Sequence, residues 1–416
     1  MRTMSRWVLI LTVLLATALV GCESASNNLG TGTVWVATQG DQKLTSFSIN
    51  LTSGALSQVG DQVATGVTPA AMAITPDQRT IFLVNSGDST IGAYSVNSDG
   101  SLKASSCSSC TAGQNPVAVA VDPTGKFLFI ANQGTFSDPT SGTVSVFSIS
   151  SGSLTGVTTF PTETAANTTG TGPSGIKVSP VSFSCASSTG PQTCYAIYVS
   201  NQFTNTVSAF QYFVDSGGTF NVVPAGGSPY AAGTNPTGLA FSRCAGITTA
   251  TAHCATNDGN NLFVTNSGSG NVTIFTACIL AVGSCATANG SLLPSSGSST
   301  TGIGPNTVVV NPVIDFVYTV DQRSNQVSQF NYSPVTAALT ALSPAAVSTA
   351  SNPTGGGITG NGTVVVVANN GTSNMSVFKV NQPPAAGGTS TATGKLVPGS
   401  QPTVSLTGQP SAVLVR

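Results

Sequence analysis

The chain has 416 residues, of which 12 are basic and 13 acidic, so its formal net charge is −1 and only 6% of its residues are charged. Such a chain offers neither a basic nor an acidic field, and we therefore expect no nucleic-acid partner. Hydrophobic residues make up 40% of the sequence and fall in regular short runs, which excludes a disordered chain and indicates strands buried against strands.

The first 21 residues have the features of an export signal. Arg2 and Arg6 give a positively charged start, and an apolar run of 14 residues extends from Trp7 to Val20. That run is too short to cross a bilayer as an ordinary transmembrane helix. The segment ends in Leu-Val-Gly-Cys22, which resembles the lipobox of bacterial lipoproteins; a plain secretory signal that contains a cysteine is the alternative.

The lipobox reading implies a mature protein that begins at a lipid-bearing Cys22. Residues 1–21 would be the signal peptide and residues 22–32 a flexible tether. Several acyl chains on one residue anchor a protein stably. We therefore expect the protein in the bacterial cell envelope, held to a membrane and facing the periplasm or the cell surface.

Residues 115–154 contain a repeating unit in its simplest form. Four short runs, rich in β-branched and aromatic residues, are separated by Gly, Pro, Asn and Ser. They are Val117–Val121, Lys126–Asn132, Gly142–Ile149 and Gly152–Leu154. This pattern predicts four consecutive antiparallel strands, and a repeated four-stranded unit is typical of a propeller blade.

Landmarks of this unit recur seven times along the chain. A proline precedes an apolar strand at Pro69, Pro116, Pro173, Pro236, Pro305, Pro353 and Pro410. A second apolar strand ends in a polar turn residue, most often Asn, at Thr38, Asn85, Asn132, Asn201, Asn266, Asp321 and Asn369. A strand of the Val-Ser-x-Phe type follows each time, as at Val144–Phe147, and a weaker fourth strand is expected after it.

The order of the landmarks at the two ends predicts how the fold closes. The chain begins at the second landmark and ends on the first, at Pro410, so its last strand supplies the missing innermost strand of the first blade. We therefore predict an all-β, seven-bladed β-propeller of four-stranded antiparallel blades over residues 33–416. A β-solenoid, the alternative, would carry capping repeats at its ends instead of complementary half-units.

Eight cysteines besides Cys22 fall in close pairs, mostly within loop insertions at residues 181–193, 243–260 and 276–289. The pairs are Cys107 with Cys110, Cys185 with Cys194, Cys244 with Cys254, and Cys278 with Cys285. In an exported protein this pattern favours four disulfides. A redox or zinc motif at Cys107-Ser-Ser-Cys110, or a metal site that joins His253 to the last four cysteines, are weaker alternatives. We expect no metal and no cofactor.

Any chemistry should gather on one face of the propeller, where second-to-third-strand turns and blade-to-blade loops surround the channel. The charged residues expected there are Asp41, Lys43, Asp61, Asp88, Asp138, Glu163, Asp321 and Arg323. A lactone hydrolase needs a general base and a group that stabilises the oxyanion. Glu163 or Asp321 could be the base and Arg323 the electrophilic partner, although each is more often a solvated turn residue.

The repeat pattern resembles a known group of propellers. Its Asn-Pro or Gly-Pro strand entry, the turn at Asp122–Leu128, the Ala-Asn strand end and the Val-Ser-Val-Phe strand resemble the lactonase-type seven-bladed propellers, which include a 6-phosphogluconolactonase, and the related YVTN-type surface repeats. The resemblance implies a hydrolytic channel-face site of charged residues and histidine. The sole histidine, His253, is expected on the opposite face, so no catalytic residue is carried over.

These observations favour an extracytoplasmic binding or scaffold module of the lactonase type, with an unknown protein or a small carbohydrate-like ligand at the channel face. Two alternatives stay open. One is a hydrolase of a lactone or sugar ester, the other a structural cell-surface protein. Fold alone does not decide among them.

Overall fold

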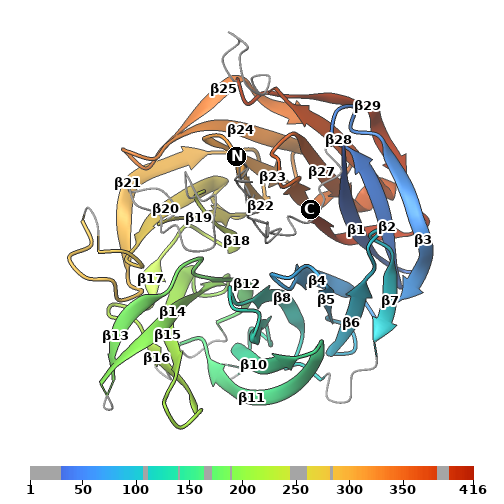
Figure 1. The fold of residues 1–416 in the computed structure, drawn as a ribbon. Coiled ribbons are helices and arrows are strands. Elements are labelled where there is room, and N and C mark those ends of the chain that lie inside the picture. The colour runs from blue at the N-terminus through green and yellow to red at the C-terminus, as the bar shows by residue number, and fades with distance from the viewer. Residues whose placement is uncertain are drawn as a thin grey trace, which may run out of the picture.

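The computed structural model describes residues 30–416 except 106–110, 139–140, 164–170, 188–189, 244–259, 282–283 and 382–392. Within these residues, the strands form seven antiparallel sheets arranged as a ring of blades (Figure 1). No helix of the described residues is long and apolar enough to cross a membrane. The predicted signal peptide and Cys22 lie outside the described residues.

Each blade contains four consecutive principal strands, except that the first blade takes its innermost strand from the C-terminus. Blades 1 to 3 are β30 (Gln409–Val415), β1 (Thr31–Gln39), β2 (Lys43–Asn50), β3 (Leu56–Ala64); β4 (Pro69–Ile74), β5 (Thr80–Asn85), β6 (Thr90–Val96), β7 (Leu102–Ser105); and β8 (Pro116–Val121), β9 (Phe127–Asn132), β10 (Thr143–Ser150), β11 (Ser153–Pro161). Blade 4 is β12 (Pro173–Val178), β14 (Gly190–Asn201), β15 (Thr206–Val214), β16 (Phe220–Pro224), with β13 (Phe183–Ser187) and β17 (Tyr230–Ala231) added. Blades 5 to 7 are β18 (Pro236–Phe241), β19 (Asn261–Asn266), β20 (Asn271–Ala277), β21 (Leu292–Thr300); β22 (Pro305–Val310), β23 (Phe316–Asp321), β24 (Gln326–Ser333), β25 (Ala338–Ser348); and β26 (Pro353–Ile358), β27 (Val364–Asn369), the 3-10 turn η1 (Asn370–Thr372), β28 (Asn374–Val380), β29 (Leu396–Ser405).

The C-terminal strand β30 closes the ring. It pairs antiparallel with β1, with Val415 opposite Val34 and Val413 opposite Val36. The sheet order β3-β2-β1-β30 makes it the innermost strand of blade 1. The predicted fold class and its mode of closure are confirmed.

The strand-entry prolines have a clear geometric role. In blades 2 to 7 the innermost strand starts at the proline itself, which needs no ladder donor at that position. The residue before it has a positive φ, for example 52° at Asn115 and 69° at Gly304. Asn and Gly tolerate this left-handed conformation better than most residues do, which explains the Asn-Pro and Gly-Pro signatures.

The hydrophobic core consists of seven separate clusters, one at each interface between neighbouring blades. Consecutive residues of one strand point into different clusters. Leu83 of blade 2 packs against blade 1, whereas Phe82 packs against blade 3. This arrangement explains why the second strands are apolar at successive positions, because both faces of each blade are buried.

The fourth strands are longer than the sequence predicted. β25 runs for 11 residues and β29 for 10, yet most of their side chains are exposed or half-buried. They lie at the outer edge of each blade, where one long edge faces solvent. Their composition therefore lacks the apolar alternation that marks a buried strand.

Two of the predicted cysteine pairs are disulfides. Cys185–Cys194 joins β13 to β14, with the Cα atoms 5.9 Å apart, and Cys278–Cys285 closes the loop after β20, with a Cα separation of 5.3 Å. Because Cys278 and Cys285 bond to each other, the alternative of a metal site that uses them does not apply. Cys107, Cys110, Cys244, Cys254 and His253 lie outside the described residues.

Removal of β30 should open the ring. A chain that ends at Gly408 exposes the inner edge of β1 and removes Val413, Leu414 and Val415 from two core clusters. Burial of these side chains contributes on the order of 4 kcal/mol or more, so we expect a correspondingly lower free energy of unfolding in urea titrations. A truncated protein that unfolds at the same urea concentration as the full chain would contradict the proposed closure.

Candidate functional site

The face that carries the second-to-third-strand turns is here called the turn face. Six of the second strands end there at one polar residue, and β1 ends one residue after Thr38. These seven are called the strand-end residues: Thr38, Asn85, Asn132, Asn201, Asn266, Asp321 and Asn369. In five blades the residue is Asn, whose Nδ2 donates to side chains of the third strand. In blade 3, for example, Asn132 donates to Thr143 Oγ1 at 3.1 Å and to Ser145 Oγ at 2.9 Å. The strand-end residues thus hold the turn to its own blade.

Asp321 is the strand-end residue of blade 6, and its side chain is fully buried. Its carboxylate accepts hydrogen bonds from the Gly302 amide at 3.1 Å, Thr319 Oγ1 at 2.8 Å and Ser328 Oγ at 2.6 Å. A weaker bond from Gln326 Nε2 spans 3.3 Å. Burial raises the pKa of Asp321, and the hydrogen bonds from Ser328 and Thr319 counteract part of that effect.

Glu163 has a similar structural role in blade 4. It follows β11 in the chain and accepts hydrogen bonds from Asn201 Nδ2 at 3.2 Å, from Thr204 Oγ1 at 2.9 Å and from Thr206 Oγ1. Its carboxylate therefore joins the loop that enters blade 4 to the second and third strands of that blade. The half-buried side chain also borders a cavity of about 250 Å³ between blades 3 and 4, whose other walls are mainly apolar.

Arg323 lies in the exposed turn between β23 and β24. Its aliphatic stem lies over Gly304, where an added Cβ would come within 2.9 Å of the Arg323 Cγ. Asp321 and Arg323 belong to blade 6, whereas Glu163 serves blade 4, and blade 5 separates them. The structure does not bring the three predicted catalytic candidates together into one acid–base site.

Two of the remaining charged residues of the sequence prediction, Asp41 and Asp88, also hold turns, whereas Lys43 is the first residue of β2. Asp41 accepts from Thr38 Oγ1 at 2.6 Å and from Thr407 Oγ1 at 2.8 Å, and Asp88 accepts from the Val67 amide at 2.9 Å. Asp61 lies within β3, not in a blade-to-blade loop as predicted, because the fourth strand extends further than expected.

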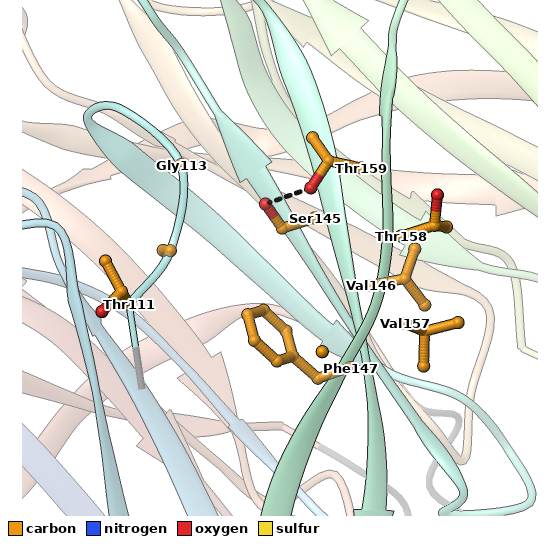
Figure 2. A pocket seen from close by; sticks show the side chains of 10 residues that line it. Thr111, Gly113, Ser145, Val146, Phe147, Val157, Thr158 and Thr159 are labelled. Atoms are coloured by element: carbon orange, nitrogen blue, oxygen red, sulfur yellow. Dashed lines mark hydrogen bonds between the residues drawn. The ribbon is translucent and has the colours of Figure 1, made fainter. Parts of the chain in front are cut away.

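Three cavities, each formed by described residues, lie away from the innermost strands. One groove, of about 390 Å³, lies between blades 2 and 3. Figure 2 shows Thr111 and Gly113 on one side of it and side chains of β10 and β11 on the other. Thr159 donates to Ser145 at 3.3 Å on its wall, and no ionisable side chain lines it. Another groove lies on the β13–β14 hairpin. Glu163 is the one ionisable residue that lines any of the three cavities described here.

Lys177 was missed by the sequence prediction. It lies on β12 and is the single charged residue on the seven innermost strands. Its side chain keeps contact with solvent, yet protein surrounds it so closely that desolvation lowers the pKa of its ammonium group. Alignment of the seven units would have revealed it, because the equivalent positions are all uncharged.

Among the described residues, no cluster of three or more His, Cys, Asp or Glu side chains has the arrangement of a metal site. Four carboxylates of the turn face, those of Asp41, Asp88, Glu163 and Asp321, accept hydrogen bonds that shape loops. What this face offers a ligand is hydroxyl and amide groups, a few exposed apolar side chains and the isolated guanidinium of Arg323.

Comparison with known proteins gives matches in sequence and structure. The sequence matches the family model described as "Lactonase, 7-bladed beta-propeller" over residues 29–175 and 161–354. No curated protein matches the sequence. A periplasmic gluconolactonase from Pseudomonas aeruginosa has a similar structure, with a TM-score of 0.66, 20% identity, and coverage of 92% of this chain and 99% of that chain.

Two further solved structures are similar. One is a provisionally assigned 6-phosphogluconolactonase from Bacteroides uniformis, with a TM-score of 0.67, 18% identity, and coverage of 93% of this chain and 100% of that chain. The other is a protein from Lactobacillus plantarum, with a TM-score of 0.64, 16% identity, and coverage of 93% of this chain and 99% of that chain. At such identities the likeness shows the fold alone.

The environment of Asp321 yields a prediction about stability. Because the folded-state pKa is raised, the stability that Asp321 contributes in its protonated form is present below the unfolded-state pKa and is lost as the pH rises through the folded-state pKa. Asp321→Asn removes this loss and restores the amide that five other blades use. We expect the free energy of unfolding at pH 7 to rise by about 1 kcal/mol, with a smaller gain at pH 4, in urea titrations.

The matched control is the reverse change in blade 5. Asn266 Oδ1 accepts from the Gly233 amide at 3.1 Å, and its Nδ2 donates to Thr273 Oγ1 at 2.9 Å, so Asn266→Asp places a buried carboxylate in an amide environment. It should lower the free energy of unfolding at pH 7 by about 1 to 3 kcal/mol. A destabilised Asp321→Asn protein with an unchanged pH dependence would contradict this account of Asp321.

Proposed function

We propose that this chain, which belongs to the lactonase family of seven-bladed β-propellers, is an extracytoplasmic binding module for a small carbohydrate-like ligand. The proposal rests mainly on one observation: the carboxylates of the turn face are already hydrogen-bonded to the protein. Asp321 and Glu163 each accept at least three hydrogen bonds from their own surroundings, so neither is arranged to activate a water molecule. A hydrolytic pair would need a base and an electrophile close together.

Exposed apolar side chains on the turn face supply a surface for such a ligand. The rings of Phe136 and Phe203 lie 5.3 Å apart in an edge-to-face arrangement, and Phe136 is 57% exposed. Val67 and Ile303 are exposed in the blade-to-blade loops of the same face. An exposed aromatic ring can pack on the C–H face of a sugar, while neighbouring amides and hydroxyls bond its hydroxyl groups. A partner protein is the alternative occupant.

A lipid anchor at Cys22 would orient this face. Strand β1 begins at Thr31 and reaches the turn face only at its end, so the chain enters the propeller from the opposite face. The eight residues between Cys22 and Thr31 would span at most about 29 Å when extended. An anchored protein would therefore hold the opposite face near the membrane and direct the turn face away from it.

Hydrolysis of a lactone or sugar ester is the second candidate function. It is favoured by the family match and by the name of the Pseudomonas aeruginosa neighbour, a periplasmic gluconolactonase. The candidate residues in this chain remain Arg323, with its exposed guanidinium, and the carboxylates of Asp321 and Glu163. Glu163 lies apart from Arg323 by a whole blade, and the Asp321 carboxylate is buried and hydrogen-bonded, which makes this candidate the weaker one.

Binding without turnover is the expected behaviour of the mature protein. In calorimetric titrations with glucose, galactose, maltose and cellobiose, we expect at least one sugar to bind. Phe136→Ala should weaken that binding by about threefold or more, because an aromatic contact is lost. Val335→Ala, a change at an 84% exposed valine between β24 and β25, is the matched control and should have no effect.

The same preparation decides between the two candidates when it is mixed with δ-gluconolactone. The binding proposal predicts hydrolysis no faster than in buffer alone. Rapid hydrolysis that is lost in Arg323→Ala would overturn the proposal in favour of the hydrolase.

The anchor has its own test in the cell. Cys22→Ser should abolish lipid attachment, so the protein should move from the membrane fraction to the soluble envelope fraction, as followed by immunoblotting. Thr31→Ser, within β1, is the control and should stay in the membrane fraction. Unchanged membrane association of Cys22→Ser would contradict the anchor.

A further inference from the structure

Lys177 occupies a position that is apolar or small in every other blade. Counted four residues after the strand-entry proline, the equivalents are Ala73, Ala120, Ala240, Val309, Gly357 and Leu414. The backbone is the same at this position, since each innermost strand of blades 2 to 7 has a register shift just after its proline. Lys177 is thus the one charged residue at a position that is uncharged in six other repeats. Such a departure, with no evident benefit for packing, indicates a function.

The direction of the side chain follows from its neighbours on β12. Ile176 and Val178 pack into the cluster between blades 3 and 4, so Lys177, which alternates with them, faces blade 5. β14 covers the outer edge of β12, and β8 and β18 lie on its two sides. Since Lys177 is nevertheless exposed, the solvent that reaches it comes from the interior of the ring or its mouth.

No counter-ion faces this ammonium group from the described elements packed against β12. β8, β9 and β18 carry no titratable side chain, and β14 carries only Tyr195, Tyr198 and the disulfide-bonded Cys194. Tyr198 is fully buried and donates its hydroxyl to the Gly290 carbonyl at 3.0 Å. The acidic residue next to β8 is Asp122.

The Asp122 carboxylate bonds to the backbone of the turn that follows β8. It is buried, and its carboxylate accepts the amides of Lys126 and Phe127, each at 2.8 Å. Lys177 is therefore a solvent-accessible cation on an innermost strand, without a hydrogen bond or ion pair to any described residue. The protein around it lowers the pKa of its ammonium group by desolvation, and a ligand of opposite charge would compensate that cost.

We propose that Lys177 is an anion-binding group inside the ring and that its ligand is a small oxyanion, a carboxylate or a phosphate. The ammonium group would form a charge-assisted hydrogen bond with the oxyanion, in a site where enclosure weakens the competition from water. This site lies on an innermost strand, apart from the aromatic pair of the turn face, so it goes beyond the binding of a neutral sugar. Lys177 lies four residues from the turn-face end of β12, so gluconate and inorganic phosphate would each use Lys177 without the aromatic pair.

The proposal is tested by calorimetry on the mature protein at low ionic strength, with gluconate, inorganic phosphate and neutral glucose as probes. We expect gluconate or phosphate to bind the wild type and Lys177→Met to weaken this binding by about tenfold or more, as for the loss of one charge-assisted bond. Lys177→Arg should retain binding. Lys103→Met, which removes an exposed lysine of β7, should leave it unchanged.

Anion binding should also be linked to protons. The enclosed ammonium has a lowered pKa, and a bound anion raises it again, so binding should take up protons at alkaline pH and weaken as the pH rises through the lowered pKa. Lys177→Arg should bind without this dependence, because guanidinium stays protonated.

Two outcomes would overturn the proposal. One is equal anion affinity in Lys177→Met and the wild type, with unchanged thermal unfolding of the variant; Lys177 would then be a lysine whose stem covers apolar surface while its ammonium is solvated. The other is the absence of gluconate and phosphate binding to the wild type. If Lys177→Met loses anion binding but still binds sugar, the proposed sugar-binding function is unaffected. The experiment therefore tests anion binding by Lys177 separately from sugar binding.

Discussion

The structure depends on the closure of the ring by β30 and β1. No blade has a hydrophobic core of its own, because each of the seven core clusters is shared between two neighbouring blades. An open row of blades would leave two apolar sheet faces in water. Pairing of the C-terminal strand with the first blade removes both ends at once, and every turn is then held at a fixed position around one axis.

Closure also determines what polar residues on the turn face can do. Each second strand must end in a side chain that bonds the third strand, and blade 6 meets this requirement with Asp321 instead of Asn. Blade 4 adds Glu163 to the same kind of network through Asn201 and two threonines. Both acids that the sequence suggested as catalytic candidates accept several hydrogen bonds from the scaffold. The same scaffold has a single isolated cation on its inner wall, Lys177, where the repeat needs none.

The sequence predicted the architecture well because each landmark occurs seven times, so an error in locating one strand does not change the number of blades. Seven prolines, seven strand-end residues and a displaced last strand determine blade number and closure without knowledge of any side-chain contact. The fourth strands were predicted poorly, because an outer strand with a solvent-exposed edge needs no apolar pattern. The structural role of Asp321 could have been predicted, because Asp321 aligns with five Asn residues. Lys177 could have been identified as an exception, because it aligns with six apolar or small residues.

The roles of other site residues could not be predicted. Glu163 contacts Asn201 across 38 residues and a loop insertion, and no local pattern reveals such a contact. Nor does the sequence reveal that Arg323 forms no ion pair with a described residue. Interactions of this kind follow from how the blades are placed around the ring, and short-range sequence signals do not contain that information.

The most direct test of this account is the titration of the Asp321 carboxyl carbon by ¹³C NMR, with Asp321→Asn used to assign the resonance. The account predicts an apparent pKa above the ordinary aspartate range, because the group is buried in a hydrogen-bonded structural network. It also predicts the same titration curve in Arg323→Ala. An ordinary or lowered pKa that depends on Arg323 would contradict it, because such a carboxylate would be solvated and paired with Arg323 in an acid–base site.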